Sequence, residues 1–243
     1  MRRRILSVGT LLALSTGLSV CSCGSATPTA PDPLGSHAIV FNDAAGALRD
    51  HEITIRAILN STLDRVADAL QIAGVTITVT PGPGIAGYGI GGFTPSGGAI
   101  QIAVDPTFPG LAQVLPDRLP SIAAHELHHA KRWRGPGYGR TLLEALVSEG
   151  LADHFAIEFL GAPVPPWSDA FPRDQTAFFL AQARPEFDAA AYDHERWFFG
   201  TGPALPRWTG YTLGFRLVEA YQAAHPGITA AQLVNASATV FRP

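Results

Sequence analysis

The feature that most constrains this chain is the segment His-Glu-Leu-His-His at positions 125–129. It contains the pattern His-Glu-x-x-His, in which His125 and His129 are four positions apart. Side chains at this spacing lie on one face of an α-helix, one turn from each other. Both imidazoles can therefore reach the same ion, with Glu126 beside them. The pattern predicts that the segment is helical and that the two histidines bind Zn²⁺.

The ends of this helix can also be predicted. Ser121 follows Pro120 and is a favourable N-cap, while Gly135-Pro136-Gly137 should end the helix after about Trp133. His128 could compete with His129 as a metal ligand. We favour His129 because the His-Glu-x-x-His arrangement is the recurrent one. His128 is then expected to be a partly exposed neighbour of the site.

A second helix should follow, because Thr141-Leu-Leu-Glu144 matches a capping box. This structural role accounts for Glu144. Glu149 lies further along the same predicted helix, 20 positions after His129, and Asp153 lies one helical turn beyond Glu149. A catalytic zinc needs a third protein ligand and one open position.

With these residues in place, the chain resembles the gluzincin clan of zinc metallopeptidases, and the thermolysin-like enzymes in particular. In that clan a helical glutamate at about this distance supplies the third ligand, which implies Glu149. An aspartate one turn further on orients the first histidine, which implies the same role for Asp153 toward His125. The resemblance implies one zinc per chain.

The likeness extends to an uncharacterised family of predicted zinc-dependent proteases, domain of unknown function 2268. It rests on HELHH, on TLLEALVSEGLADHFA at 141–156 and on GYTLGF at 210–215, and it covers roughly Tyr88 to the C-terminus. The implied fold is a zincin-like metallopeptidase domain.

The implied reaction is peptide-bond hydrolysis with Glu126 as the general base for a zinc-activated water. Tyr211, at the start of a C-terminal helix, is the candidate that helps zinc to stabilise the oxyanion. A packed aromatic at a helix start is the alternative interpretation of Tyr211. His194 and His154 are the other candidates for the oxyanion role.

Hydrophobic periodicity predicts an α+β fold, with a small N-terminal sheet and a helical C-terminal half. A helix is expected over 43–73, and strands are expected over 75–80 and 99–104. Residues 81–98 are rich in glycine and turn-prone. The segment 87–104 is also a candidate edge strand that receives an extended peptide, because its glycines permit close backbone approach.

The first 23 residues have the pattern of a bacterial lipoprotein signal. Arg2 to Arg4 precede the apolar run Ile5 to Val20, which is too short for a confident membrane span. A transmembrane anchor is the alternative. Cys23, or else Cys21, is the expected lipidation site. Residues 24–36 are expected to be a flexible tether and 37–243 the metallopeptidase domain. The protein is thus expected to be exported to the bacterial cell envelope and lipid-anchored to the membrane.

Composition excludes several other classes. With 47% hydrophobic and 15% charged residues, the chain can bury a core and is not disordered. The net charge of −3 says little about partners, but the sequence has no basic stripe of the kind that nucleic-acid binding needs, so no nucleic-acid partner is expected. The expected partners are a peptide or protein substrate and the membrane. The alternatives are a zinc-stabilised binding lipoprotein without turnover and a hydrolase of non-peptide amides.

Overall fold

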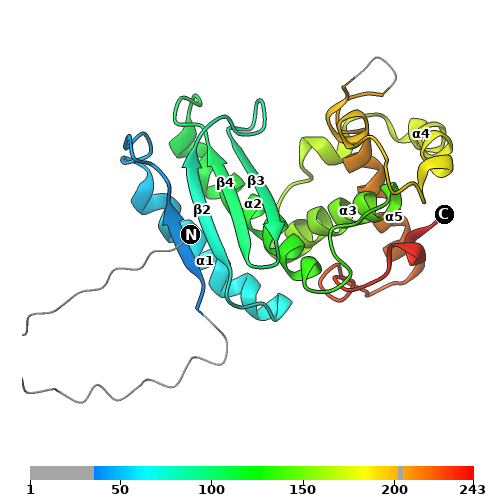
Figure 1. Cartoon of the computed structure of the whole chain (residues 1–243), viewed down its shortest axis with the longest axis horizontal. Helices are drawn as coiled ribbons and strands as arrows, with labels where there is room; N and C mark the ends of the chain where they lie inside the picture. The colour runs from blue at the N-terminus through cyan, green and yellow to red at the C-terminus, as the bar shows by residue number, and fades with distance from the viewer. Residues whose placement is uncertain (1–35, 202–204) are drawn as a thin grey trace, which may run out of the picture. The chain divides into compact units, whose positions relative to one another are not determined.

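A four-stranded sheet precedes a helical half in the part of the chain that the computed structural model describes, residues 36–201 and 205–243 (Figure 1). The expected α+β class is therefore confirmed. The predicted signal, both cysteines and nearly all of the predicted tether lie outside the described residues. No helix within the described ranges is long and apolar enough to cross a membrane.

The strands are β1 (Ala38–Phe41), β2 (Thr76–Pro81), β3 (Ile90–Ser96) and β4 (Ala99–Val104). The described ranges contain the α-helices α1 (Glu52–Leu70), α2 (Leu111–Trp133), α3 (Leu142–Leu160), α4 (Thr176–Ala183) and α5 (Thr209–Ala224). Short 3-10 turns cover Pro166–Asp169, Arg173–Gln175, Arg184–Glu186 and Ala238–Phe241, and one turn of π-helix covers Glu195–Phe199.

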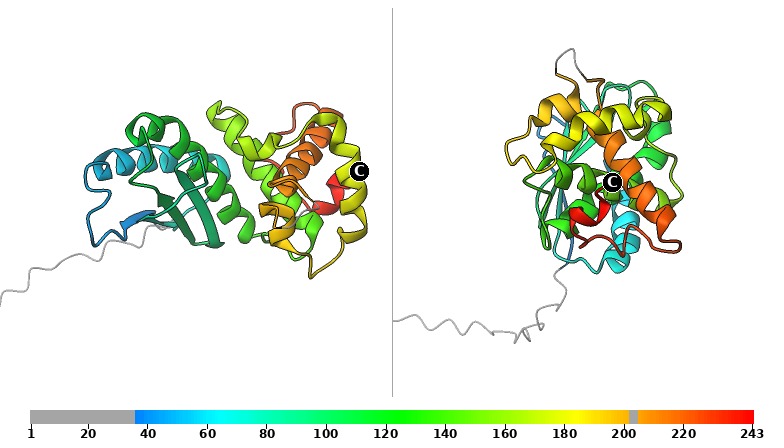
Figure 2. Two further views of the ribbon diagram at one scale, coloured as in Figure 1. Left: turned by 90° about the horizontal axis from the view of Figure 1, so that it is seen from above. Right: turned by 90° about the vertical axis from the view of Figure 1, so that its right-hand side faces the viewer.

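The strand order is β1-β2-β4-β3, with β3 antiparallel to β4 and the other pairs parallel. Helices α1 and α2 cover one face of this sheet (Figure 2). Alternation explains this arrangement, because Ile77 and Ile100 are fully buried whereas Thr76 and Gln101 are exposed. The two strands expected from the sequence are present as β2 and β4.

Strands β1 and β3 were not predicted as separate strands. The sequence of β3, IGGFTPS, has two glycines and a proline, which disfavour a strand on propensity alone. Its position at the edge tolerates proline, and pairing with β4 supplies the missing stabilisation. The expected edge strand within 87–104 is β3, and β4 lies inside the sheet.

Helix α1 is shorter than the predicted 43–73. Its N-terminal flank forms turns, because the Asp43 carboxylate accepts hydrogen bonds from the backbone N–H groups of Ala47 and Leu48 at 2.8 and 2.7 Å. Such side-chain bonds compete with helical ones. At the other end Gln71 adopts a left-handed conformation with φ 49°, which ends the helix before Gly74.

Helix α2 begins ten residues before the predicted N-cap Ser121, at Leu111, so that prediction is wrong. Pro116 and Pro120 lie inside the helix, each at a cost of about 3 kcal/mol. Leu111, Leu115 and Leu119 on one face are at most 4% exposed, and each contributes about 1.5–3 kcal/mol on burial. Their burial offsets the proline cost. The C-terminal end at Trp133 is as predicted.

Candidate metal centre and substrate cleft

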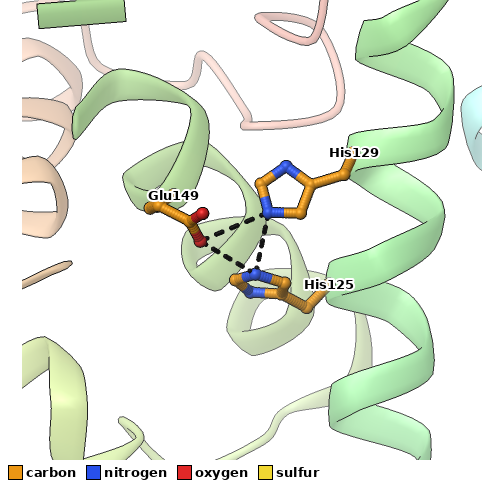
Figure 3. Close-up of side chains that lie close together, drawn as sticks. All are labelled: His125, His129 and Glu149. Atoms are coloured by element: carbon orange, nitrogen blue, oxygen red, sulfur yellow. Dashed lines mark hydrogen bonds and ion pairs between the residues drawn. The ribbon is translucent and has the colours of Figure 1, made fainter. Parts of the chain in front are cut away.

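His125 and His129 project from the same face of α2 and meet Glu149 of α3 (Figure 3). The two Nε2 atoms are 2.9 Å apart, and Glu149 Oε2 lies 3.1 Å from that of His125 and 3.2 Å from that of His129. All three side chains are buried. Among the described residues, these three side chains form a group that could hold a metal ion.

Local features of α3 place Glu149 there. Thr141 is the N-cap, and both hydrogen bonds of the predicted capping box are present with Glu144. The following residue, Gly150, lets α3 and α5 touch: a Cβ on Gly150 would lie 2.2 Å from the carbonyl oxygen of Gly214. The close contact between the two helices fixes the turn that carries Glu149.

The donor set fits a zinc ion. Zinc takes imidazole nitrogens and carboxylate oxygens, and in a tetrahedral site with bonds of about 2.0–2.1 Å these atoms lie about 3.3 Å apart. Two imidazole nitrogens 2.9 Å apart repel each other unless a proton or a cation lies between them, and a zinc ion can take that place. Burial raises the pKa of Glu149, but the imidazoles of His129 and His125 outweigh it and hold that pKa well below its usual range. Glu149 is therefore a carboxylate.

Asp153 lies behind His125, where its Oδ1 is 2.7 Å from His125 Nδ1. Because a carboxylate only accepts, Nδ1–H of His125 donates, and this leaves the Nε2 lone pair directed at the cluster. Trp167 Nε1 donates to both oxygens of Asp153 at 3.1 Å, and the Ser168 hydroxyl donates to Oδ2. Asp153 is thereby held by the 3-10 turn Pro166–Asp169.

Glu126 lies beside the cluster without being part of it. Thr94 of β3 donates its hydroxyl to Glu126 Oε2 at 2.6 Å and to the Glu126 carbonyl at 3.0 Å. Burial raises the pKa of Glu126, although His125 and His129 oppose the shift. Gly92 faces this carboxylate so closely that a Cβ there would lie 2.4 Å from Oε1. Gly92 was expected as one of the glycines that permit close backbone approach, but its contact with Glu126, like that of Thr94, was not predicted, because both contacts are tertiary.

The cluster opens into a cleft of about 430 Å³. Its lining includes His125, Glu126, His129 and Glu149 together with residues of β3 and of the C-terminal half. The aromatic side chains at its rim, Phe93, Trp133 and Phe199, are 61%, 41% and 41% exposed. Exposed aromatic groups around a polar centre are typical of a binding site.

Three residues of the cleft could donate a proton or a hydrogen bond to a substrate oxygen: Tyr138, Tyr211 and His194. Tyr211 and His194 were candidates from the sequence, and Tyr138 was not. The Tyr138 hydroxyl donates to Glu149 Oε1 at 2.7 Å. Burial, followed by the charge of Glu149, raises the pKa of both tyrosines well above the usual value, so both keep their protons.

Two other histidines differ from expectation. His128 was expected to be partly exposed, but it is 0% exposed, packs 5.5 Å from the Phe155 ring and has no hydrogen-bond partner among the described residues. It points away from the cleft because it is one residue from His129 on the helix. Desolvation lowers its pKa well below the usual value. His154 stacks on Phe215 and lies within 3.0 Å of the Phe215 carbonyl, outside the cleft lining.

The chain has an α+β fold with a His-His-Glu cluster on two adjoining helices. These features define a protein with a candidate catalytic metal centre. The chain is a member of the family described as "Predicted Zn-dependent protease (DUF2268)", whose model matches residues 86–242. This match includes the whole cluster and confirms the extent of the resemblance found in the sequence. The description of the family suggests a zinc-dependent protease, in agreement with a cluster whose donor set fits zinc.

A search of curated proteins gives one relative of interest. "Uncharacterized protein YjfC" of Bacillus subtilis (strain 168) is 28% identical over 122 residues, which is 44% of this chain and 41% of that protein. The chain thus matches less than half of the length of this relative.

Proposed function

We propose that the protein is a zinc-dependent peptidase of the gluzincin type, with zinc held by His125, His129 and Glu149 and with Glu126 as the general base. The observation that carries the proposal is that a cluster of metal-binding side chains lies next to a carboxylate that can act as a base. Three buried ligand atoms lie within 3.2 Å of one another, and the carboxylate of Glu126 faces the cleft next to them.

The chemistry divides between the ion and the chain. A bound zinc ion would supply Lewis acidity and would lower the pKa of a coordinated water toward neutrality. Glu126 accepts the proton of the attacking water and delivers it to the leaving amine. Its raised pKa suits both steps, since it brings proton affinity closer to neutral pH. Thr94 holds the Glu126 carboxylate in place.

The developing oxyanion needs a donor besides the metal. Tyr211 keeps the role inferred from the sequence, since it lines the cleft and retains its proton. Tyr138 also lines the cleft, but its single hydroxyl hydrogen is donated to Glu149, so it would have to leave Glu149 to serve as a second donor.

Strand β3 borders the same cleft through Gly92, Phe93 and Thr94. Among the described strands β3 pairs only with β4. Its outer edge already accepts hydrogen bonds at the carbonyls of Ile90 and Thr94, so an extended peptide would pair with it around Gly92.

The test is turnover by the Glu126→Gln variant. We expect it to keep one zinc per chain and to lose at least about a hundredfold in kcat on a mixed peptide substrate, because general-base catalysis contributes 10²–10⁴-fold. Glu219→Gln is the matched control, because this glutamate pairs with Arg173 on the surface. Wild-type turnover by Glu126→Gln contradicts the mechanism. Zinc without turnover in the wild-type protein favours the zinc-stabilised binding lipoprotein instead.

We also propose, from the sequence of the first 23 residues, that the chain is exported and lipid-anchored through Cys23. Mass spectrometry of the N-terminal peptide from bacterial membranes tests this proposal. A diacylglyceryl group on Cys23 that Cys23→Ala removes and Cys21→Ala retains supports it. The reverse pattern assigns the anchor to Cys21, and an unmodified peptide contradicts lipidation.

A further inference from the structure

A second lobe adjoins the cleft at Glu126, and its lining includes an arginine that the proposed mechanism does not use. This lobe has a volume of about 80 Å³ and shares His125, Glu126 and Tyr211 with the main cleft. Its lining also includes Ile122, Trp167, Arg207 and Trp208. Arg207 and the proposed general base Glu126 therefore line the same lobe.

The volume of the lobe limits what it can hold. At about 80 Å³ the lobe is the smaller part of the cleft, and it can admit a small polar group such as a carboxylate. The main cleft, at about 430 Å³, is the part that can take a large side chain.

Although Arg207 is exposed, its backbone is held in place. Gly200 approaches so closely that a Cβ there would lie 2.7 Å from the Arg207 Cα. The next residue, Trp208, has a left-handed backbone with φ 69°, and its N–H donates to the Phe198 carbonyl at 3.2 Å. A left-handed tryptophan is an outlier that persists only where the surroundings enforce it. The guanidinium lies over the Trp208 ring, 4.5 Å from its centroid.

The charge of Arg207 has no partner among the ion pairs of the described residues. Arg173, Arg196 and Arg242 each lie within 2.7 Å of a carboxylate oxygen. Some other exposed arginines, such as Arg65, also have no ion pair among the described residues, but Arg207 is the one that lines the lobe. A planar guanidinium binds carboxylates through two parallel hydrogen bonds. The small volume, the fixed backbone and the unpaired charge all suit the same ligand.

We propose that Arg207 binds a carboxylate of the substrate, so that the enzyme selects peptides that carry a negative charge close to the scissile bond. This inference rests on the proposed peptidase function. The carboxylate has two chemical sources, an acidic side chain or the free C-terminus of the peptide. Either one enters the lobe while the rest of the peptide occupies the main cleft.

The experiment compares full-length zinc-loaded wild type with Arg207→Gln and Arg65→Gln. Arg65 is a matched control, since it too is exposed and lies over an aromatic ring, with Phe159 at 5.6 Å, but on α1. The substrates are peptide pairs that differ only by Glu against Gln at one position, or by a free against an amidated C-terminus. Cleavage sites and kcat/KM are read by mass spectrometry.

We expect wild type and Arg65→Gln to prefer one member of a pair by about tenfold, mostly through KM, and Arg207→Gln to lose that preference. Loss for the Glu/Gln pairs assigns an acidic side chain, and loss for the acid/amide pairs assigns the C-terminal carboxylate. A preference that survives in Arg207→Gln, or a wild type without any preference, overturns the proposal.

A binding measurement separates this inference from the peptidase function. Fluorescence anisotropy of the same labelled peptides is measured on Glu126→Gln, with and without Arg207→Gln. Tighter binding of the carboxylate peptide that depends on Arg207 supports the subsite even if no peptide is turned over. Equal binding by both proteins overturns the subsite even if wild type is an active peptidase.

Discussion

The metal cluster and the rim of the cleft differ in how the chain builds them. The cluster comes from two successive helices, with its residues between positions 125 and 149 and its spacing set by helical turns. The rim joins segments that are far apart in the chain: Thr94 meets Glu126 across 32 positions, and Trp133 donates to the Thr94 carbonyl across 39. The chemistry is thus encoded locally, whereas the shape that receives a substrate depends on tertiary packing.

The largest effect on stability should come from a substitution in α5, which contributes no ligand to the cluster but packs against α3. A Cβ at Gly214 would lie 1.9 Å from the Leu146 carbonyl oxygen, so Gly214→Ala must push α5 away from α3. We expect a loss of about 3 kcal/mol in the free energy of unfolding, measured by urea denaturation. Gly161→Ala is the control, because φ is +69° there but no atom is within 4 Å; it should cost about 1 kcal/mol. Equal losses in Gly214→Ala and Gly161→Ala would contradict a steric origin of the Gly214→Ala effect.

A smaller effect should come from Asp153→Asn, which weakens the group behind His125. Residues that orient a ligand typically contribute 10–100-fold to metal affinity, so we expect zinc to bind about 10–100-fold more weakly. Competition with a chromophoric chelator measures this change. Asp188→Asn, in a surface ion pair with Arg242, should leave the affinity unchanged. A change of less than about twofold in Asp153→Asn would show that the hydrogen bond to His125 does not support the metal.

The smallest effect should come from Thr141→Ala at the start of α3. Loss of an N-cap side chain costs about 1 kcal/mol, and this should appear as a lower urea midpoint. Zinc stoichiometry should stay at the wild-type value, because the contact of Gly150 with α5 still fixes the turn that carries Glu149. Loss of zinc from this variant would show that the cap, and not the helix contact, positions the ligand.

The sequence predicted the parts of the molecule that depend on local periodicity. The α+β class, strands β2 and β4, the end of α2 and the capping box of α3 follow from patterns a few residues long. The cluster geometry belongs to the same category, because helical spacing brings His125 and His129 onto one face. Glu149 needed the family resemblance in addition, since its approach to α2 depends on how two helices pack.

The remaining features could not be predicted because partners distant in the chain determine them. Strand β3 exists by pairing with β4, against the preference of its glycines and proline. Helix α2 continues through Pro116 and Pro120 because its leucines are buried. Tyr138 lies in a glycine-rich connection, and only the fold brings its hydroxyl to Glu149. His128 was placed at the rim because its packing against Phe155 is likewise tertiary.

The most direct test of the central claim is the zinc content of the purified full-length protein, compared with His125→Ala and His128→Leu. His128 is the matched control in the same pentapeptide, because it is buried against Phe155 and away from the cleft. Elemental analysis should give one zinc per chain in wild type and in His128→Leu, and none in His125→Ala. A folded wild-type protein without zinc, prepared without chelator, or a His125→Ala variant that keeps its zinc, would contradict the account.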